Sequence, residues 1–382
     1  MIGAGLSVAG LRAAVLVSGA TIGEFIAVRH ARVAPARGLL MTIRKLWVQL
    51  AAAAAASVVV AGTAEAGPTL DKVKQGGLVC GVPTGIPGFG MPDSQGKYSG
   101  LDIDVCKAIE AAISGDPEKV KYVPLTAQQR FTALQSGEVD VLSNNTTWTL
   151  QRDTDLGLNF GPVVFYDGQG FMVPKKLGVK SAKELNGATI CVGPGTTSEL
   201  NLADYFRATK MDFKPVVIEK IDEQYAAFFS GRCDVISGDA SGLAAQRSGR
   251  ASKPDDYVVL PERISKEPLA PVMRHGDEQW HDIIDWVVYA LFEAEERGIT
   301  QKNVDEMTKS EDPNIKRMLG VTPGMGKALG LDEKWAYNAI KVVGNYGEIF
   351  ERHLGPETPI GFERGLNNLW TKGGLIYAMP IR

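Results

Sequence analysis

The hydrophobic pattern of the chain contains one unit of helix and strand twice. Residues 131–143 read FTALQSGEVDVLS, and residues 225–237 read YAAFFSGRCDVIS. In both segments a helical stretch begins with an aromatic residue and ends at Ser-Gly. Two residues later comes Asp-Val, followed by Leu or Ile and then Ser. Gly137 and Gly231 suit the position just after a helix, and the apolar runs are typical of buried parallel strands. Each half of the chain is therefore predicted to hold the same helix–strand unit.

A second pair of similar segments precedes these units. Residues 77–85 read GLVCGVPTG and residues 188–196 read ATICVGPGT, each a β-type run with one cysteine that enters a Gly/Pro loop. The alternative is a chance likeness between short apolar runs. Because strand, loop, helix and strand recur in the same order, the pattern favours two similar α/β lobes.

The C-terminal third is predicted to be helical. Apolar residues fall at helical spacing from Asp277 to Gly298 and again from Lys334 to Leu354, and the Pro/Gly-rich stretch 320–330 links the two segments. A long helical region of this kind can pack across the first lobe.

Composition narrows the class of protein. The chain has 382 residues, of which 45% are hydrophobic and 22% are charged, as in ordinary globular proteins. These proportions argue against a disordered, collagen-like or multi-span membrane protein. The formal net charge of −3 and the lack of a long basic run give no indication of nucleic-acid binding. No catalytic motif or metal-ligand spacing stands out, so we expect no cofactor, no metal and no enzymatic activity.

The beginning of the sequence indicates export. A short basic segment from Met41 is followed by an apolar run over 46–62 and by an A-x-A cleavage site at 64–66. We expect a signal peptide over 41–66, cleaved before Gly67, and a periplasmic protein; an uncleaved anchor is the alternative. Residues 1–40 are interpreted as an unstructured upstream mis-start.

All four cysteines fall in the part predicted to be exported: Cys80, Cys106, Cys191 and Cys233. An even number of cysteines in an oxidising compartment favours disulfides, and four cysteines allow three connectivities. One disulfide per lobe favours Cys80–Cys106 and Cys191–Cys233. Four buried thiols are the alternative.

A polar segment follows the first repeated strand. It reads SNNTTWTLQRD over 143–153, and ligands of open α/β sheets bind beyond the carboxyl ends of strands. Arg152 supplies a planar cation that fits a carboxylate, and Asp239, after the second repeated strand, can accept from an ammonium group. An Arg in one lobe and an Asp in the other match the two ends of a zwitterion. A surface Arg and a helix-capping Asp are the alternative.

The sequence resembles the periplasmic substrate-binding proteins of polar amino acid ABC transporters, in particular the general L-amino acid-binding branch and its glutamate/glutamine/aspartate/asparagine-binding relatives. The resemblance covers essentially all of 67–382 and implies an α/β, bilobed type II fold with two crossing strands and an extended helical C-terminal part. Lobe 1 is expected to comprise 67–165 and 270–382, and lobe 2 to comprise 170–265. The stretches that carry the resemblance are VCGVPTGIPGFG, GLDIDVCKAIEAA, LTAQQRFTALQSGEVDVLSNNTTWTLQRD, LNFGPVVFYDGQGFMV and GNYGEIFERHLG.

The resemblance also implies the ligand-binding residues. Arg152 lies where the family holds the α-carboxylate, with Asn145 and Thr147 assisting, and Asp239 lies where it holds the α-ammonium. Small residues stand where smaller relatives often carry larger or charged ones, which favours a broad pocket: Gly193, Gly238 and Ala127.

Further positions follow from the same resemblance. Thr197 and Ser198 are expected to present backbone N–H groups at a helix N-terminus, a natural carboxylate site. Phe89 matches an aromatic that packs on the ligand, although a plain core phenylalanine explains it equally. Asp102 and Asp104 match a family signature that helix capping explains as well as binding does.

The resulting expectation is a monomeric solute-binding component that captures L-amino acids, polar, acidic and neutral alike, by lobe closure. It would deliver them to a permease in the inner membrane. One alternative is a cyclohexadienyl dehydratase-like enzyme, which needs a general acid in the cleft. Others are a sensory module of a membrane receptor and a sulfonate- or polyamine-binding protein of related fold.

Overall fold

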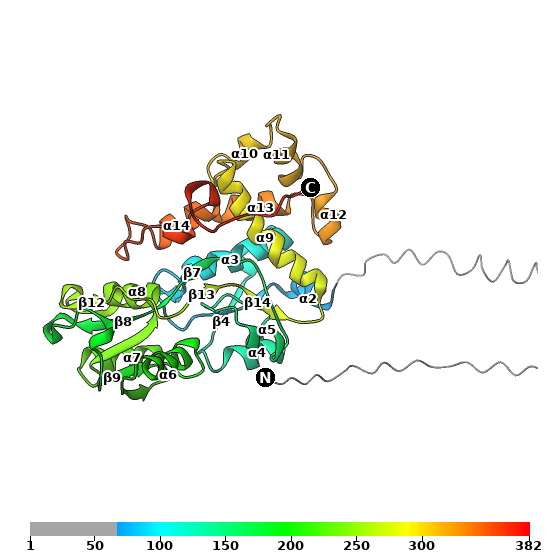
Figure 1. Ribbon diagram of the computed structural model, residues 1–382. Helices are drawn as coiled ribbons and strands as arrows, with labels where there is room; N and C mark the ends of the chain where they lie inside the picture. Colours follow the sequence, from blue (N-terminus) through cyan, green and yellow to red (C-terminus); the bar gives the residue numbers. More distant parts are fainter. Residues whose placement is uncertain (1–66) are drawn as a thin grey trace, which may run out of the picture. The chain divides into compact units, whose positions relative to one another are not determined.

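The computed structural model describes residues 67–382. The predicted upstream segment 1–40 and the predicted signal peptide 41–66 lie outside the described residues. Within 67–382 the chain forms two α/β lobes, each built on a five-stranded mixed sheet (Figure 1). The predicted bilobed α/β fold is confirmed.

Lobe 1 is built on the sheet with strand order β4-β1-β5-β14-β6. Its strands are β1 (Val79–Val82), β4 (Lys121–Pro124), β5 (Val141–Leu142), β6 (Leu158–Phe160) and β14 (Val272–Arg274). β1 runs parallel to β4 and β5, whereas β14 runs antiparallel to β5 and β6. Its other elements are α2 (Pro68–Gly76), the hairpin of β2 (Met91–Pro92) and β3 (Tyr98–Ser99), α3 (Leu101–Ser114), α4 (Arg130–Gln135) and α5 (Leu150–Thr154).

Lobe 2 repeats this arrangement with strand order β10-β9-β11-β8-β12. Its elements are β8 (Gln169–Pro174), β9 (Thr189–Val192), α6 (Thr197–Thr209), β10 (Lys214–Val217), α7 (Ile221–Phe229), β11 (Val235–Asp239), α8 (Ala240–Arg250) and β12 (Tyr257–Val259). β9 runs parallel to β10 and β11, and β8 runs antiparallel to β11 and β12. Gly137 and Gly231 have φ angles of 80° and 83° just after α4 and α7, as the repeat predicts.

Two short strands join the lobes. β7 (Phe165–Asp167) and β13 (Glu267–Leu269) pair antiparallel, with Glu267 opposite Asp167 and Leu269 opposite Phe165. Because β7 leads from β6 to β8 and β13 leads from β12 to β14, this pair is the predicted crossing of the chain between lobes. We call it the hinge.

The C-terminal part is helical and covers lobe 1 (Figure 1). Its helices are α9 (Glu278–Glu296), α10 (Val304–Met307), α11 (Pro313–Met318), α12 (Met325–Leu329), α13 (Trp335–Val343) and α14 (Tyr346–His353). The single helix predicted from Lys334 to Leu354 is wrong. Gly344, with a φ of 82°, ends α13, and Asn345 starts α14 in a capping box with Glu348.

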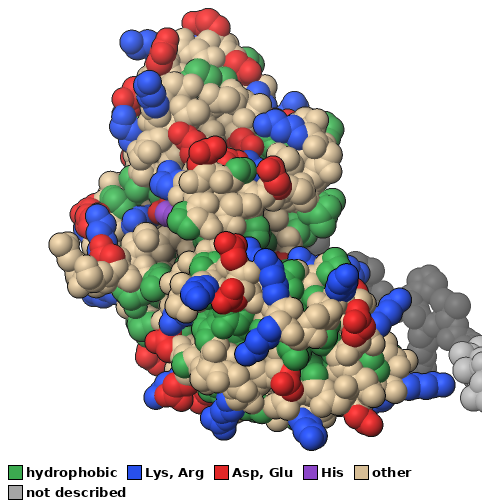
Figure 2. All heavy atoms as spheres, turned by 90° about the vertical axis from the view of Figure 1, so that its left-hand side faces the viewer, with side chains coloured by type: hydrophobic (Ala, Val, Ile, Leu, Met, Phe, Trp, Pro, Cys, Tyr) green, Lys and Arg blue, Asp and Glu red, His purple; other side chains and the backbone are tan. Residues whose placement is uncertain are grey.

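The hydrophobic core follows this division. One cluster unites the helices of lobe 1 with the C-terminal helices, and two smaller clusters fill lobe 2. Short 3-10 helices lie at η1 (Pro117–Lys119), η2 (Lys175–Leu177), η3 (Ala182–Glu184), η4 (Pro254–Asp256), η5 (Gly365–Asn367) and η6 (Trp370–Lys372). On the face shown in Figure 2, positive and negative side chains are interspersed, in keeping with the small net charge of −3.

Each lobe carries one disulfide. Cys80 of β1 is bonded to Cys106 of α3, and Cys191 of β9 is bonded to Cys233 just before β11. The predicted connectivity is therefore confirmed. Among residues 67–382, no helix has both the length and the apolar content needed to cross a membrane.

Candidate functional site

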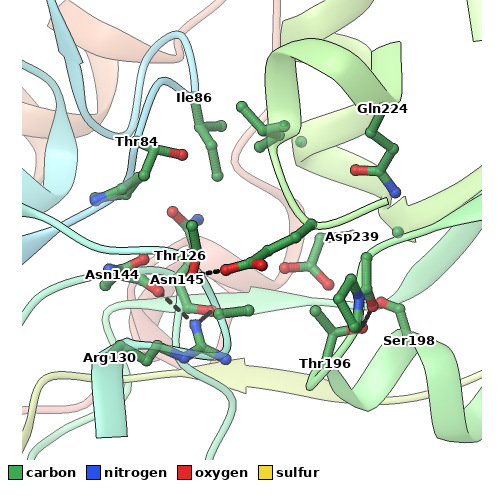
Figure 3. Close-up of a pocket in the computed structure, with 18 of the residues that line it drawn as sticks. Thr84, Ile86, Thr126, Arg130, Asn144, Asn145, Thr196, Ser198, Gln224 and Asp239 are labelled. Atoms are coloured by element: carbon green, nitrogen blue, oxygen red, sulfur yellow. Dashed lines mark hydrogen bonds between the residues drawn. The ribbon is translucent and has the colours of Figure 1, made fainter. Parts of the chain in front are cut away.

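A cleft between the two lobes gathers the ends of the parallel strands. Thr84 follows β1, Thr126 follows β4 and Asn144 follows β5, and all three line the cleft from lobe 1 (Figure 3). Gly193 follows β9 and Asp239 ends β11 on the side of lobe 2. The position beyond the carboxyl ends of the strands is the one expected for a ligand site in an open α/β sheet.

Most of the residues predicted from the sequence meet in this cleft. Five of the seven predicted ligand-binding residues line it: Asn145, Thr147, Thr197, Ser198 and Asp239. Arg152 and Phe89 are not among the lining residues.

Arg152 supports the lining of the cleft. Its side chain is buried, its Nη1 donates to the carbonyl oxygen of Thr147 over 2.8 Å, and its Cζ lies 5.0 Å from the centre of the Phe131 ring. Burial lowers the pKa of Arg152, and the carboxylates of Glu267 and Asp239 oppose that shift. These contacts place its charge close to the cleft, and its role as the carboxylate ligand stays a prediction.

Phe89 belongs to the core of lobe 1. Its ring is 1% exposed and packs edge-to-face on Phe165, with ring centres 5.2 Å apart. This position agrees with the alternative of a core phenylalanine, and contact of Phe89 with a ligand stays a prediction. Ile86, in the same loop, is an apolar side chain that lines the cleft (Figure 3).

Arg130 is a cleft residue that the sequence reasoning missed. It begins α4, and its Nη1 donates to the carbonyl oxygens of Asn144 at 2.8 Å and Asn145 at 3.4 Å. Its buried Nε has no partner among the described residues. Burial, together with the charge of Arg152, lowers its pKa to about 9, and nearby carboxylates oppose this shift. Lobe 1 thus presents a buried cation directly to the cleft.

The repeat holds a signal that points to Arg130. Arg130 precedes Phe131 in the first copy, and Gln224 precedes Tyr225 in the second. Arg130, Gln224 and Tyr225 all line the cleft. Extending each copy by one residue toward the N-terminus would have identified both polar side chains.

Asp239 is the acidic residue of lobe 2 at the cleft. It ends β11 and precedes α8, yet its side chain makes no capping hydrogen bond to that helix. Burial raises its pKa well above the ordinary value, the carboxylates of Asp167 and Glu267 raise it further, and Arg130 and Arg152 oppose the shift. A half-buried carboxylate without a role in helix capping is suited to accept hydrogen bonds from a ligand cation.

The loop after β5 is held by a buried carboxylate. Asp102 accepts from the Ser143 hydroxyl at 2.8 Å and from the Asn145 backbone N–H at 3.3 Å, and Asn145 adopts a φ of 42°. Burial raises the pKa of Asp102 to about 7 against these hydrogen bonds. Asp104 instead bonds Arg352 of α14. Neither aspartate caps α3, so the capping alternative is wrong for both.

The start of α6 faces the cleft from lobe 2. Thr196 caps the helix by accepting from the Glu199 backbone N–H, and Thr197 and Ser198 form the first turn. N–H groups in the first turn of a helix have no intrahelical partner and favour an anion. The predicted arrangement of Thr197 and Ser198 at a helix N-terminus is therefore present.

Hydrogen bonds cross from one lobe to the other beside the cleft, and Arg250 of α8 makes one of them to the Gly85 carbonyl over 3.1 Å. The Thr126 hydroxyl donates to Glu219 over 2.8 Å, and the Gln246 amide donates to the Gly85 carbonyl over 2.9 Å. The lobes are therefore closed upon one another. Space remains in the cleft, because a Cβ atom added at Gly238 would meet no atom within 4 Å.

The comparisons with known proteins agree with this geometry. Residues 78–304 match the family model described as bacterial extracellular solute-binding proteins, family 3. The chain is 57% identical over 335 residues to the general L-amino acid-binding periplasmic protein AapJ of Rhizobium johnstonii, covering 87% of this chain and 98% of that protein. It is 56% identical over 332 residues to the glutamate/glutamine/aspartate/asparagine-binding protein BztA of Rhodobacter capsulatus, covering 86% and 97%.

A solved structure is similar as well. The ABC transporter/periplasmic binding protein from Brucella ovis with glutathione bound has a TM-score of 0.81 and 55% identity, covering 82% of this chain and 99% of that one. The family model spans more than half of the chain, and the relatives align along almost their whole length. The chain belongs to the bacterial extracellular solute-binding proteins of family 3.

Proposed function

We propose that the protein is the periplasmic solute-binding component of an amino acid ABC transporter and captures L-amino acids in the interlobe cleft. The observation that carries this proposal is the opposite charge of the two walls. Lobe 1 brings the guanidinium of Arg130, with Arg152 beside it, and lobe 2 brings the carboxylate of Asp239. An L-amino acid is a zwitterion that presents one charge to each wall.

The two arginines together form the carboxylate end of the site. Arg130 and Arg152 lie 4.9 Å and 5.0 Å from the same Phe131 ring centre, and both retain donors for a ligand. A carboxylate between them would gain charge-assisted hydrogen bonds in a desolvated setting. The α-ammonium group would then meet Asp239, and its charge would favour the ionised form of that residue.

Closure completes the mechanism. In the open form, the ligand binds to lobe 1, and α6 and Asp239 then close over it from lobe 2. Closing excludes water, which strengthens each charged contact. The closed form is what we propose the inner-membrane permease recognises, with the protein acting as a monomer.

The ligand range is proposed to be broad. Gly193, Gly238 and Ala127 line the cleft without filling it. The neighbour from Brucella ovis was solved with glutathione bound, and the glutamyl end of glutathione carries the same α-ammonium and α-carboxylate pair. Glutathione therefore belongs in the ligand set beside the twenty amino acids.

The proposed processing and lobe limits are those expected from the sequence. A signal peptide over 41–66 directs export, and cleavage before Gly67 leaves the periplasmic chain 67–382. Lobe 1 then comprises 67–165 and 270–382, and lobe 2 comprises 170–265. The named relatives are transport-associated binding proteins, so the enzyme alternative finds no support among them.

The test is calorimetric titration of ligand-stripped 67–382 with the twenty L-amino acids and glutathione. Stripping by unfolding and refolding removes any ligand that purifies with the protein. Binding of acidic and neutral amino acids alike supports both the site and its breadth. Binding of one or two alone refutes the breadth, and binding of none refutes the proposed function.

A further inference from the structure

Glu267 is a buried carboxylate on the hinge. It begins β13, is 1% exposed and stands opposite Asp167 of β7. Its side chain accepts four hydrogen bonds, two at each carboxylate oxygen. The donors are the hydroxyl of Thr147 at 2.6 Å, the hydroxyl of Thr197 at 2.8 Å, the amide of Asn201 at 2.9 Å and the hydroxyl of Ser265.

These donors come from both lobes. Oε2 of Glu267 accepts from Thr147, in the cleft loop of lobe 1, and from Thr197, in the first turn of α6 in lobe 2. Oε1 accepts from Asn201, one helical turn further along α6. One oxygen atom therefore joins the two walls of the cleft at their base.

The two sides of this bridge are not attached to the hinge equally. The loop of lobe 1 is bound to the hinge segment by backbone hydrogen bonds, from Trp148 to Pro268 at 2.9 Å and from Ala270 to Thr146 at 3.1 Å. α6 meets Glu267 through the side chains of Thr197 and Asn201. Opening of the lobes is therefore expected to break the α6 side of the bridge first.

We propose that Glu267 is a positioning residue that latches lobe 2 onto the hinge in the closed form and so slows release of the ligand. The latch rests on the proposed function, since it acts on lobe closure over a bound amino acid. When α6 moves away, a buried carboxylate loses two of its four donors, and this loss opposes opening.

The latch also fixes how two cleft residues meet the ligand. Thr147 and Thr197 both line the cleft, and both hydroxyls donate to Glu267. A hydroxyl has one proton, so neither can donate it to a ligand carboxylate at the same time. Their oxygens can then serve the ligand as acceptors only, and lobe 2 still offers donors from the N–H groups of the first turn of α6 and from the Gln224 amide.

The experiment compares Glu267→Gln with a matched control in the 67–382 protein. Glu262→Gln removes the same charge, but Glu262 accepts from Ser181 within lobe 2 and is not part of the cleft lining. Affinity is measured by calorimetry and the dissociation rate by stopped-flow fluorescence, with the tightest-binding of the twenty L-amino acids. We expect Glu267→Gln to release ligand about tenfold faster with a similar association rate, and Glu262→Gln to match the wild type.

A second pair of variants separates the latch from a general effect of charge. Asn201→Leu removes a lobe 2 donor and keeps Glu267, and it is expected to speed release in the same direction. Thr197→Val is expected to speed release in the wild type but to add little in the Glu267→Gln background, because both changes break one contact. If the effects of Thr197→Val and Glu267→Gln on the dissociation rate add fully in the double variant, the latch is overturned.

The remaining outcomes are also decisive. A wild-type dissociation rate in Glu267→Gln, or a loss confined to the association rate, overturns the proposal. If Glu267→Gln does not fold, the dissociation rate of Asn201→Leu decides. If the wild type binds no amino acid, the proposed function fails. Small-angle scattering of the ligand-free proteins then tests the latch, with a larger radius of gyration expected for Glu267→Gln than for Glu262→Gln and an equal radius overturning it.

Discussion

The two lobes share one strand order but turn opposite charges toward the cleft. In lobe 1, β5 stops at Leu142, and a polar loop held by Asp102 follows beside Arg130. In lobe 2, β11 continues to Asp239 and leads directly into α8. β1 and β9, and likewise β5 and β11, occupy matching places in their sheets. The same framework therefore places cations on one wall and a carboxylate on the other.

The difference arises at equivalent positions of the repeat. Arg130 and Gln224 each precede the aromatic residue of their copy, Phe131 or Tyr225, and both reach the cleft. One copy thus supplies a charge where the other supplies a neutral amide. A repeated fold can therefore build a cleft with unlike walls through substitutions at matching sites, without a change of topology.

The lobes also differ in packing. α9, α13 and α14 share the larger of the two hydrophobic clusters of lobe 1, whereas lobe 2 has two small clusters. Because lobe 1 with the C-terminal helices buries more apolar side chains than lobe 2, we expect lobe 1 to be the platform and lobe 2 to be the part that closes.

Removing a positive charge from lobe 1 is expected to have the largest effect. Arg152→Ala and Arg130→Ala should each weaken amino acid binding by about 2–5 kcal/mol, because each strands a buried carboxylate of the ligand. Calorimetric titration measures the loss. Arg274→Ala is the control, since Arg274 bonds the carbonyls of Leu134 and Val139 and does not line the cleft. If Arg152→Ala binds with wild-type affinity, Arg152 is not a ligand of the carboxylate, and Arg130 is then the arginine that holds it.

Neutralising Asp239, the acidic residue of the lobe 2 wall, is expected to weaken amino acid binding somewhat less than removing an arginine from lobe 1. Asp239→Asn keeps the size of the side chain and removes the charge that meets the ammonium group, so we expect a loss of about 1.5–3 kcal/mol. The matched control is Asp234→Asn, which precedes β11 in the same lobe and accepts from the Thr189 backbone outside the cleft. Equal affinities in the two variants would contradict the role of Asp239.

Amino acid affinity is expected to fall as the pH is lowered. Burial raises the pKa of Asp239 in the free protein, whereas the ligand ammonium favours its ionised form, so binding releases a proton below that pKa. The affinity should drop by up to about tenfold for each pH unit below the raised pKa and level off above it. Calorimetry between about pH 5 and about pH 8, in buffers of different ionisation enthalpy, counts the protons. Proton uptake would contradict this assignment.

The smallest expected effect concerns breadth. Gly238→Val places a side chain where an added Cβ meets nothing within 4 Å, so the protein should fold. The side chain would occupy ligand space, and affinity for the largest amino acids should fall by about 1 kcal/mol or more. Glycine and alanine serve as internal controls and should bind as before. An equal loss for all ligands would show that Gly238 affects the fold and not the room for the side chain.

Much of the fold could be predicted because its signals are local. The strand–loop–helix–strand repeat and the amphipathic pattern of α9 are visible within short windows of sequence. The break between α13 and α14 was missed although its signal is present, since Asn345 and Glu348 have capping-box spacing.

The site was harder to predict because its contacts are distant in sequence. Phe89 packs in the core against Phe165. Glu267 accepts a hydrogen bond from Thr147, which lies 120 positions away in the sequence. Such pairings depend on how the hinge brings the lobes together. Arg130 was missed because it reaches the cleft only when α4, which it begins, lies beside the loop that follows β5.

The proposed function requires that the cleft recognises a zwitterion with one charge on each lobe. The most direct test compares three ligands in one calorimetric series: the tightest-binding L-amino acid, its α-hydroxy acid, which lacks the ammonium, and its α-amide, which lacks the carboxylate. We predict that both analogues bind at least about a hundredfold more weakly, since each leaves one buried charge of the cleft unpaired. Binding of either analogue with the affinity of the parent amino acid would contradict the claim.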